Sequence, residues 1–174
     1  MSLEACQDAV AEGRVDMAIS GFCWMPDRAE RFNLSDSYHA GENSSCQVLL
    51  TTAGHDGRYT SSVGLRGCRI GVQAASLQEW LVKQQLPGAE AVPCGGIDEG
   101  IALLKSGSLD ALALAEGNAD ALCNADPDLI KTGFYFELTE GLLDNLILLQ
   151  KGDDDLTAAV NELLARAEAS GCYE

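Results

Sequence analysis

Basic residues are scarce in this sequence. It has 11 lysines and arginines against 27 aspartates and glutamates, which gives a formal net charge of −16. Such a surface repels phosphates, so the composition argues against nucleic acid or an anionic membrane surface as a partner. No apolar run approaches the roughly 20 residues that cross a bilayer. The start, MSLEACQDAV, has neither a basic segment nor an apolar core, so we predict no secretion signal there.

Patterns that bind metals or carry out catalysis are also scarce. The chain has seven cysteines, of which no two stand at Cys-x-x-Cys spacing, and its only histidines are His39 and His55. We therefore expect no metal site, and we interpret most cysteines as small buried residues. The run from Asp153 to Asp155 precedes a predicted helix, where carboxylates complement the helix dipole. No Ser-His-Asp triad, phosphate-binding loop or dinucleotide fingerprint is recognisable, so we expect no cofactor.

Two segments of the chain share one design. Residues 9–20 (AVAEGRVDMAIS) and 103–116 (LLKSGSLDALALAE) each show a helix end, a glycine, an aspartate and an apolar strand. Gly13 and Gly107 stand where the end of a helix needs a left-handed residue. The apolar runs are typical of parallel strands buried on both faces. We interpret the pattern as two α/β units, each with its own sheet; the alternative is a chance likeness between two helix-to-strand loops.

Strands and helices alternate along the rest of the chain, which predicts the α/β class. Ser76 and Glu79 form a Ser-x-x-Glu capping box at a helix start. Strands are expected at 47–52, 69–73, 89–93 and 145–149, and helices from 76, over 97–105, at 118–123 and after 155. The last helix should bury one apolar face, made by Leu156, Val160, Leu163, Leu164 and Ala167. Residues 130–138 show a mixed pattern.

Two residues are candidates for binding an anion. Ser76 follows the strand 69–73 through a tight turn and opens a helix, where free backbone N–H groups favour a carboxylate or phosphate. The alternative is that Ser76 only caps its helix. Arg28 lies at the tip of the turn in GFCWMPDRAERFNLSDSY, and a guanidinium there can bind a carboxylate through two hydrogen bonds. The alternative is a surface arginine paired with Asp27 or Glu30.

Longer segments resemble one family. GRVDMAISGFCWMPDRAERFNLSDSY is similar to the signature of the family 3 extracellular solute-binding proteins, the amino-acid-binding components of ABC importers. LRGCRIGVQAASLQEWL, PGAEAVPCGGIDEGIALLKSGSLDALAL and QKGDDDLTAAVNELLARAEASGCYE continue the resemblance in the family's order, from about Glu12 to Tyr173. The resemblance implies a two-lobed, periplasmic-binding-protein-like fold with lobe one at 1–39 and 140–174 and lobe two at 40–139. The first quarter of the family's pattern is not matched, so lobe one is expected to be incomplete.

The resemblance also implies a ligand site shared by both lobes. Arg28 corresponds to the arginine that binds the ligand's α-carboxylate, and Ser76 contributes from the other lobe. The implied site consists of Gly21, Cys23, Arg28, Gln73, Ser76 and Glu116. Cys23 stands where the family has a threonine. Ala115 stands where the family has the carboxylate that binds the ligand's ammonium, and Glu116 follows one residue later. This departure allows a ligand that lacks an ammonium group.

The expected function is therefore to bind a small ligand, an amino acid or a related carboxylate, for an ABC permease at a periplasmic or cell-surface location. One alternative is an enzyme, a dehydratase of cyclic dienyl acids in which Glu116 is the acid or base. Others are the ligand-sensing module of a larger receptor and a degenerate piece that binds nothing. An incomplete lobe one would expose apolar faces, so we also expect a homodimer through that lobe.

Overall fold

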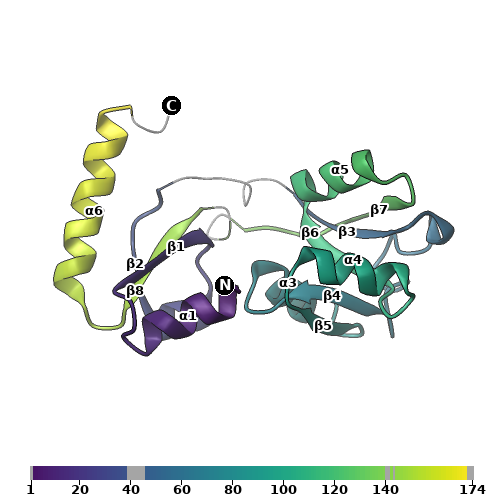
Figure 1. Ribbon diagram of the computed structural model, residues 1–174, viewed down its shortest axis with the longest axis horizontal. Coiled ribbons are helices and arrows are strands. Elements are labelled where there is room, and N and C mark those ends of the chain that lie inside the picture. The colour runs from purple at the N-terminus through teal and green to yellow at the C-terminus, as the bar shows by residue number, and fades with distance from the viewer. Residues whose placement is uncertain (1, 39–45, 140–141, 143, 172–174) are drawn as a thin grey trace. The chain divides into compact units, whose positions relative to one another are not determined.

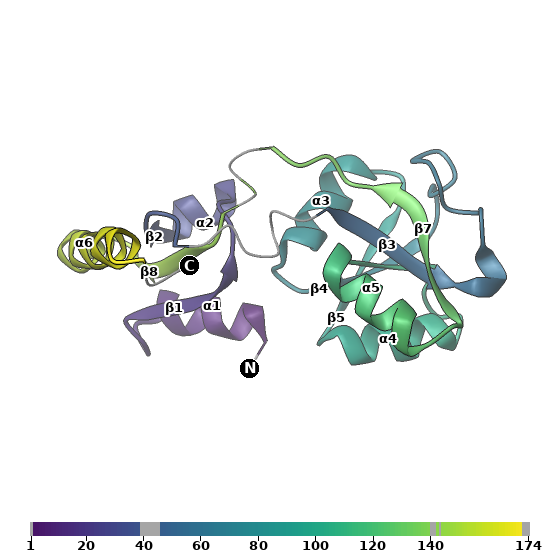
Figure 2. The same ribbon diagram turned by 90° about the horizontal axis from the view of Figure 1, so that it is seen from above.

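The computed structural model describes residues 2–38, 46–139, 142 and 144–171. The chain divides into two compact units: unit 1 contains Leu3–Ser44 and Thr139–Glu174, and unit 2 contains Ser45–Leu138. Each unit has its own sheet and its own helices, as Figures 1 and 2 show. The predicted lobe boundary at 39/40 lies outside the described residues, and the one at 139/140 lies at their edge.

Unit 1 is a three-stranded sheet with helices on both faces. Strand β8 (Leu146–Gln150) is central and pairs antiparallel with β1 (Met17–Phe22) and β2 (Phe32–Leu34). Because neighbouring side chains of a strand point to opposite faces, β8 joins two cores. Leu148 packs with Val10 of helix α1 (Leu3–Ala11). Ile147 and Leu149 pack with Val160 of helix α6 (Asp154–Ala169).

Three expectations for unit 1 were wrong. Strand β1 is not a parallel strand buried on both faces, because it lies at the edge of the sheet and Ile19 is 61% exposed. The turn that carries Arg28 contains a short helix, α2 (Pro26–Arg31), which begins at a proline, a residue well suited to that position. On α6, Val160 is buried but Leu163 is 60% exposed, so the predicted apolar face is only partly covered.

Unit 2 is a five-stranded sheet in the order β5-β4-β6-β3-β7. Its strands are β3 (Gln47–Thr52), β4 (Arg69–Gln73), β5 (Glu90–Cys94), β6 (Ala111–Ala115) and β7 (Leu129–Tyr135). Its helices are α3 (Leu77–Gln85), α4 (Ile97–Lys105), α5 (Glu116–Ala125) and the short 3-10 helix η2 (Ala53–His55). Strand β4 runs parallel to β5 and β6, and β3 runs antiparallel to β6 and β7.

Most sequence expectations for unit 2 are confirmed. Strand β6 is buried at every position and pairs parallel with β4. Gly107 has φ +77°, and in unit 1 Gly13 has φ +68°, so both glycines take the left-handed conformation expected after a helix. Strand β7 was not recognised in the mixed stretch 130–138, because its register shifts against β3 and a left-handed Gly133 interrupts the alternation of side chains.

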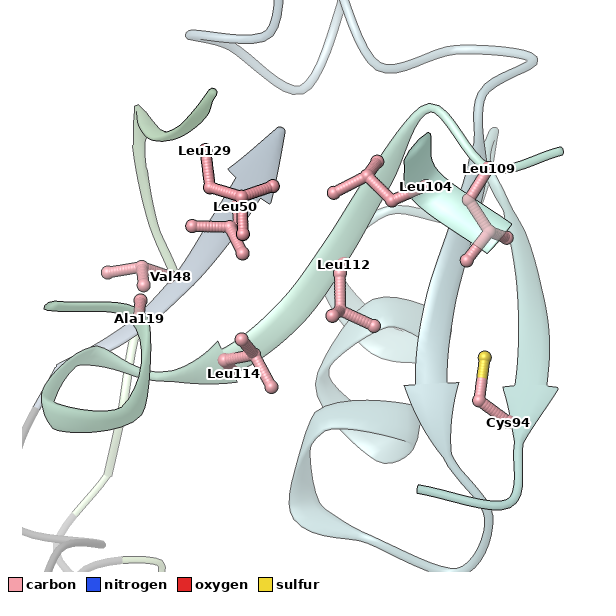
Figure 3. Close-up of a cluster of buried hydrophobic side chains, with 9 residues drawn as sticks. All are labelled: Val48, Leu50, Cys94, Leu104, Leu109, Leu112, Leu114, Ala119 and Leu129. Carbon is pink, nitrogen blue, oxygen red and sulfur yellow. The ribbon is translucent and has the colours of Figure 1, made fainter. Parts of the chain in front are cut away.

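One core cluster of unit 2 joins its sheet to α4 and α5 (Figure 3). Its buried members are Val48, Leu50, Cys94, Leu104, Leu109, Leu112, Leu114, Ala119 and Leu129. Two glycines let the backbone come close to these side chains. A Cβ added to Gly71 of β4 would lie 2.6 Å from Leu109 Cδ1 and 2.9 Å from Leu112 Cδ1, and one on Gly100 of α4 would lie 2.6 Å from Leu112 Cδ1.

We predict that Gly71→Ala lowers the free energy of unfolding by about 1–3 kcal/mol, the usual cost of overpacking a core. Gly117→Ala in α5 is the matched control, because its Cβ would meet nothing within 4 Å. That control should be neutral or slightly stabilising, since alanine favours helix over glycine. Urea unfolding followed by circular dichroism measures both changes, and equal stability of the two variants would contradict the packing described for β4.

Candidate functional site

In unit 2 the carboxyl ends of three parallel strands meet around a small cavity. Strands β5, β4 and β6 end at Cys94, Gln73 and Ala115. The chain leaves β4 for β5 on one side and then returns to β6 on the other, which makes this edge a topological switch point, where open α/β sheets bind ligands. The cavity has a volume of about 50 Å³ and is lined by Gln73, Gln78, Cys94, Gly96, Ile97, Asn118 and residues 112–115.

Ser76 caps α3, as its sequence pattern predicts. Its Oγ accepts a hydrogen bond of 3.2 Å from the Glu79 backbone N–H, and the residue is only 3% exposed. The Glu79 carboxylate accepts a 2.7 Å bond from the N–H of Ala75, one residue before the position that a standard capping box uses. Ala75, in the tight turn between β4 and α3, takes the left-handed conformation with φ +59°. Binding of an anion by Ser76 stays a prediction.

Amide side chains provide the polar part of the cavity lining. Gln78 follows Ser76 in the first turn of α3, and its Nε2 donates a 2.7 Å hydrogen bond to Oε1 of Gln47, which is fully buried on β3. Gln73 is half-buried at the end of β4, and Asn118 lies in the first turn of α5. Such amides both donate and accept hydrogen bonds, so they can orient a small polar group without carrying charge.

Glu116 is the first residue of α5, and its carboxylate contacts the neighbouring strand. Its backbone N–H donates to the Cys46 carbonyl at 2.8 Å. Its carboxylate accepts a 2.8 Å hydrogen bond from Lys131 Nζ on β7, and Lys131 also donates to Asp120 at 2.7 Å. These hydrogen bonds, first to Asp120 and then to Glu116, raise the pKa of Lys131 well above its usual value. Lys131 therefore ties the start of α5 to the sheet.

Arg28 is buried inside unit 1 and is not a surface arginine, because only 2% of it is exposed. Its Nη1 donates to the Cys23 carbonyl at 2.8 Å and lies 3.5 Å from Cys23 Sγ. The guanidinium carbon lies 5.2 Å from the centre of the Phe22 ring, within the range of a cation–π contact. Burial lowers the pKa of Arg28 and raises the pKa of the Cys23 thiol. The end of β1 thus holds the guanidinium in one position.

Gly21 lies on the exposed side of the same strand end. A Cβ added to Gly21 would lie 3.8 Å from Asn145 Oδ1. Beside it, the Tyr38 hydroxyl donates a 2.7 Å hydrogen bond to the Ser20 carbonyl, and the Tyr38 N–H donates to the Asn145 carbonyl at 3.1 Å. These contacts bring together residues from distant parts of the sequence.

The six predicted site residues therefore form two groups. Gly21, Cys23 and Arg28 lie together in unit 1, whereas Gln73, Ser76 and Glu116 belong to unit 2. Sequence reasoning missed four further residues at these positions, namely Tyr38, Gln78, Asn118 and Lys131. The position of Gln78 and Asn118 in the first helical turn after a parallel strand is a signal that could have found them. Lys131 carries no such signal, because its partners lie 11 and 15 residues away on another element.

Comparison with known proteins places the chain in a family. The model of the bacterial extracellular solute-binding proteins, family 3, matches residues 1–174, so the chain belongs to this family. It is 24% identical over 176 residues to the arginine-binding extracellular protein ArtP of Bacillus subtilis, covering 100% of this chain and 66% of ArtP. It is 26% identical over 163 residues to the L-cystine-binding protein TcyJ of Escherichia coli K12, covering 92% of this chain and 58% of TcyJ.

Solved structures agree with this assignment. The chain is similar to the amino acid ABC transporter substrate-binding protein AbpA of Streptococcus pneumoniae bound to L-arginine, with a TM-score of 0.80 and 26% identity, over 98% of this chain and 70% of AbpA. The predicted α/β class and periplasmic-binding-protein-like fold are confirmed, and the chain corresponds to part of that fold. It spans less than two thirds of the length of ArtP and TcyJ.

The described residues offer no metal site. Within residues 2–38, 46–139, 142 and 144–171, no group of three or more His, Cys, Asp or Glu side chains is placed to hold a metal ion. Asp153 instead caps α6, where its carboxylate accepts a 3.1 Å hydrogen bond from the Leu156 N–H. The six cysteines in the described part of the chain are free thiols; Cys172 lies outside it. No described helix is long and apolar enough to span a membrane.

The burial of Cys23 predicts unequal thiol reactivity. In the folded protein, a maleimide should label the exposed Cys46 rapidly and leave Cys23 unlabelled, because Cys23 is fully buried and burial raises its pKa, which lowers the thiolate fraction. Mass spectrometry of digested protein measures the labelling of each residue, and labelling in urea is the control in which both should react. Equal rates in the folded protein would show that the thiol is not enclosed as described.

Proposed function

We propose that this protein binds a small solute bearing a carboxylate, an amino acid or a related compound, and presents it to an ABC importer. Membership of the extracellular solute-binding family supports this proposal. So do the ligands in the names of similar proteins: arginine for ArtP and AbpA, and cystine for TcyJ. The observation that carries the proposal is the fixed guanidinium of Arg28 at the end of β1, in the segment whose sequence is similar to the family's signature.

In the proposed mechanism each unit supplies hydrogen-bond donors suited to a carboxylate. Arg28 in unit 1 offers a planar pair of N–H donors, and their position is set in advance by Cys23 and Phe22. In unit 2, Ser76 and the backbone N–H groups at the start of α3 offer further donors beside the cavity that Gln73 lines.

Transport rather than catalysis is the function that the site supports. The proteins to which the chain is similar are solute-binding proteins of transporters. The dehydratase alternative depended on Glu116 as an acid or base, and this carboxylate is bound to Lys131. An acid or base must reach the substrate's proton directly or through one water, and Glu116 is already engaged by a cation on a neighbouring strand.

The proposed location and partners follow from the family. Its members are extracellular proteins, so we place this one at the periplasm or the cell surface, in contact with an ABC permease. The homodimer through lobe one stays a prediction. Ile19 and Leu163, both in unit 1, are 61% and 60% exposed, and their apolar surface supports such an association.

Replacement of Arg28 tests the proposal. A ligand at a hundredfold its Kd stabilises the folded state by about 2.7 kcal/mol, so a thermal-shift screen of amino acids and related acids should find compounds that raise Tm. We expect Arg28→Ala to abolish that shift and Arg28→Lys to keep only part of it, because an ammonium lacks the forked geometry. Because Arg28 is buried, each shift is compared with the same variant free of ligand.

Arg31→Ala is the matched control. Arg31 lies on the same helix but on the surface, where it pairs with Asp8 at 3.2 Å. This variant should keep the full ligand-induced shift. A shift that survives in Arg28→Ala would remove Arg28 from the site, and a screen in which no carboxylate raises Tm would refute the proposed function itself.

A further inference from the structure

The loop that leads into β4 forms a basic surface on a strongly acidic protein. Residues 57–78 contain Arg58, Arg66 and Arg69 and no aspartate or glutamate, although the whole chain has 27 acidic residues against 11 basic ones. We propose that this loop and the C-terminal end of α3 form a docking site for a short protein segment that combines acidic and apolar residues. The site lies within unit 2, and its partner is distinct from the solute of the proposed function.

An open groove, called here the docking groove, lies between this loop and the end of α3. It has a volume of about 500 Å³ and is lined by Ser62, Arg66, Gln85, Leu86, Pro87 and Gly88. The loop leads into β4 at Arg69 and the turn after α3 leads into β5 at Glu90, so the groove lies where these parallel strands begin. The cavity that Gln73 lines lies where the strands end, at the opposite edge of the sheet.

Arg66 supplies the cation of the docking groove. Gly88 has no side chain, so the aliphatic part of Arg66 lies close to the backbone there: a Cβ added to Gly88 would meet Arg66 Cγ at 3.0 Å. Among the described residues, no carboxylate lies within 4.0 Å of the Arg66 guanidinium, whereas Arg69 pairs with Asp110 at 3.3 Å. Arg66 is exposed, so it can bind a carboxylate of a partner through two hydrogen bonds.

An apolar side chain stands in the same turn as this cation. Val63 is 70% exposed, which is more than Ile19 or Leu163 in unit 1. Its carbonyl accepts a 3.3 Å hydrogen bond from the Arg66 N–H, so the two residues belong to one turn of the loop. Protein interfaces commonly combine an arginine with apolar contacts that exclude water around it. Val63 and Arg66 therefore offer an apolar and a charged contact to one partner segment.

The loop is held in place by the rest of unit 2. Leu65 is fully buried and Tyr59 is only 6% exposed, so both anchor the loop in the protein. The Gly67 N–H donates a 2.7 Å hydrogen bond to the Gly88 carbonyl, and the Leu65 N–H donates to the Ser61 carbonyl at 3.2 Å. A surface that is already fixed loses little conformational entropy on binding, which favours docking of a specific partner.

The charge distribution favours a short protein segment over a larger anionic surface. A membrane or a nucleic acid presents negative charge over a wide area, and the net charge of −16 repels it over most of the molecule. A short acidic segment meets only the basic loop, as in other sites where clustered arginines recognise acidic motifs. Its apolar side chains can also cover Val63, which a free inorganic anion cannot do.

A library of random dodecapeptides displayed on phage tests the chemistry of the partner. Selection on the immobilised full chain should enrich sequences that combine acidic with aliphatic or aromatic residues, and calorimetry then measures the Kd of an enriched synthetic peptide. Enrichment of basic or uncharged sequences, or of no sequence, would overturn the proposal. Vesicles of phosphatidylserine and phosphatidylcholine are the second probe and should not bind, and binding to them through this loop would assign it to a membrane surface instead.

Substitutions in the loop locate the binding site. Val63 and Arg66 are both exposed, so Val63→Ser and Arg66→Glu should fold, which circular dichroism checks. We expect Arg66→Glu to weaken peptide binding about tenfold, because it reverses the charge, and Val63→Ser to weaken it about threefold, because it removes the apolar contact. Arg166→Glu on α6 is the matched control, since it changes the net charge equally at an exposed position of unit 1. Equal losses in Arg66→Glu and Arg166→Glu would show that only the overall charge acts and would refute the docking site.

Two further measurements separate docking from other behaviour of the protein. The rise in Tm caused by a solute should be the same in Arg66→Glu as in the unmodified protein, so a failure of docking and a failure of solute binding are distinguishable. Analytical ultracentrifugation measures self-association in the absence of peptide. Self-association that Arg66→Glu abolishes would identify a second copy of this chain as the occupant and would overturn the proposal of a separate partner.

Discussion

The arrangement of unit 2 depends on β4 lying between β5 and β6. Because the chain leaves β4 toward one side and returns to the other, the strands end together and α3, α4 and α5 all begin at the same edge. The close approach of the core to Gly71 and Gly100 keeps the helices near the sheet. Every group assigned to the unit 2 part of the site, from Gln73 to Asn118, lies at this edge because of that single topological constraint.

The main constraint in unit 1 is the burial of a cation, because the Arg28 guanidinium is almost fully shielded from solvent. The Arg28 guanidinium is held by a backbone carbonyl, a thiol sulfur and an aromatic ring, none of which is an anion. A carbonyl and an aromatic ring fix the position of the guanidinium through a hydrogen bond and a cation–π contact. Cys23, which departs from the family's threonine, is part of this support.

Sequence reasoning was most successful where local chemistry decides the structure. The cap at Ser76, the left-handed glycines at 13 and 107 and the buried strand β6 all follow from a few neighbouring residues. It failed where a distant strand decides. The exposure of Ile19 depends on β1 having β8 as its neighbour on one side only, and the engagement of Glu116 depends on Lys131 of β7. Residue types alone could nominate Arg28 and Glu116 but could not show that Arg28 is enclosed by the end of β1 and that Glu116 is bound to Lys131.

The position of β1 at the rim of its sheet has a practical consequence for handling the protein. An edge strand offers a row of N–H and C=O groups to any extended polypeptide, and the solvent-facing isoleucine makes such pairing more favourable. The net charge of −16 opposes contact between copies through long-range repulsion, which dissolved salt weakens as the Debye length shortens. Dilute, low-salt solutions therefore preserve separate molecules, and concentrated, salty ones promote intermolecular sheet growth.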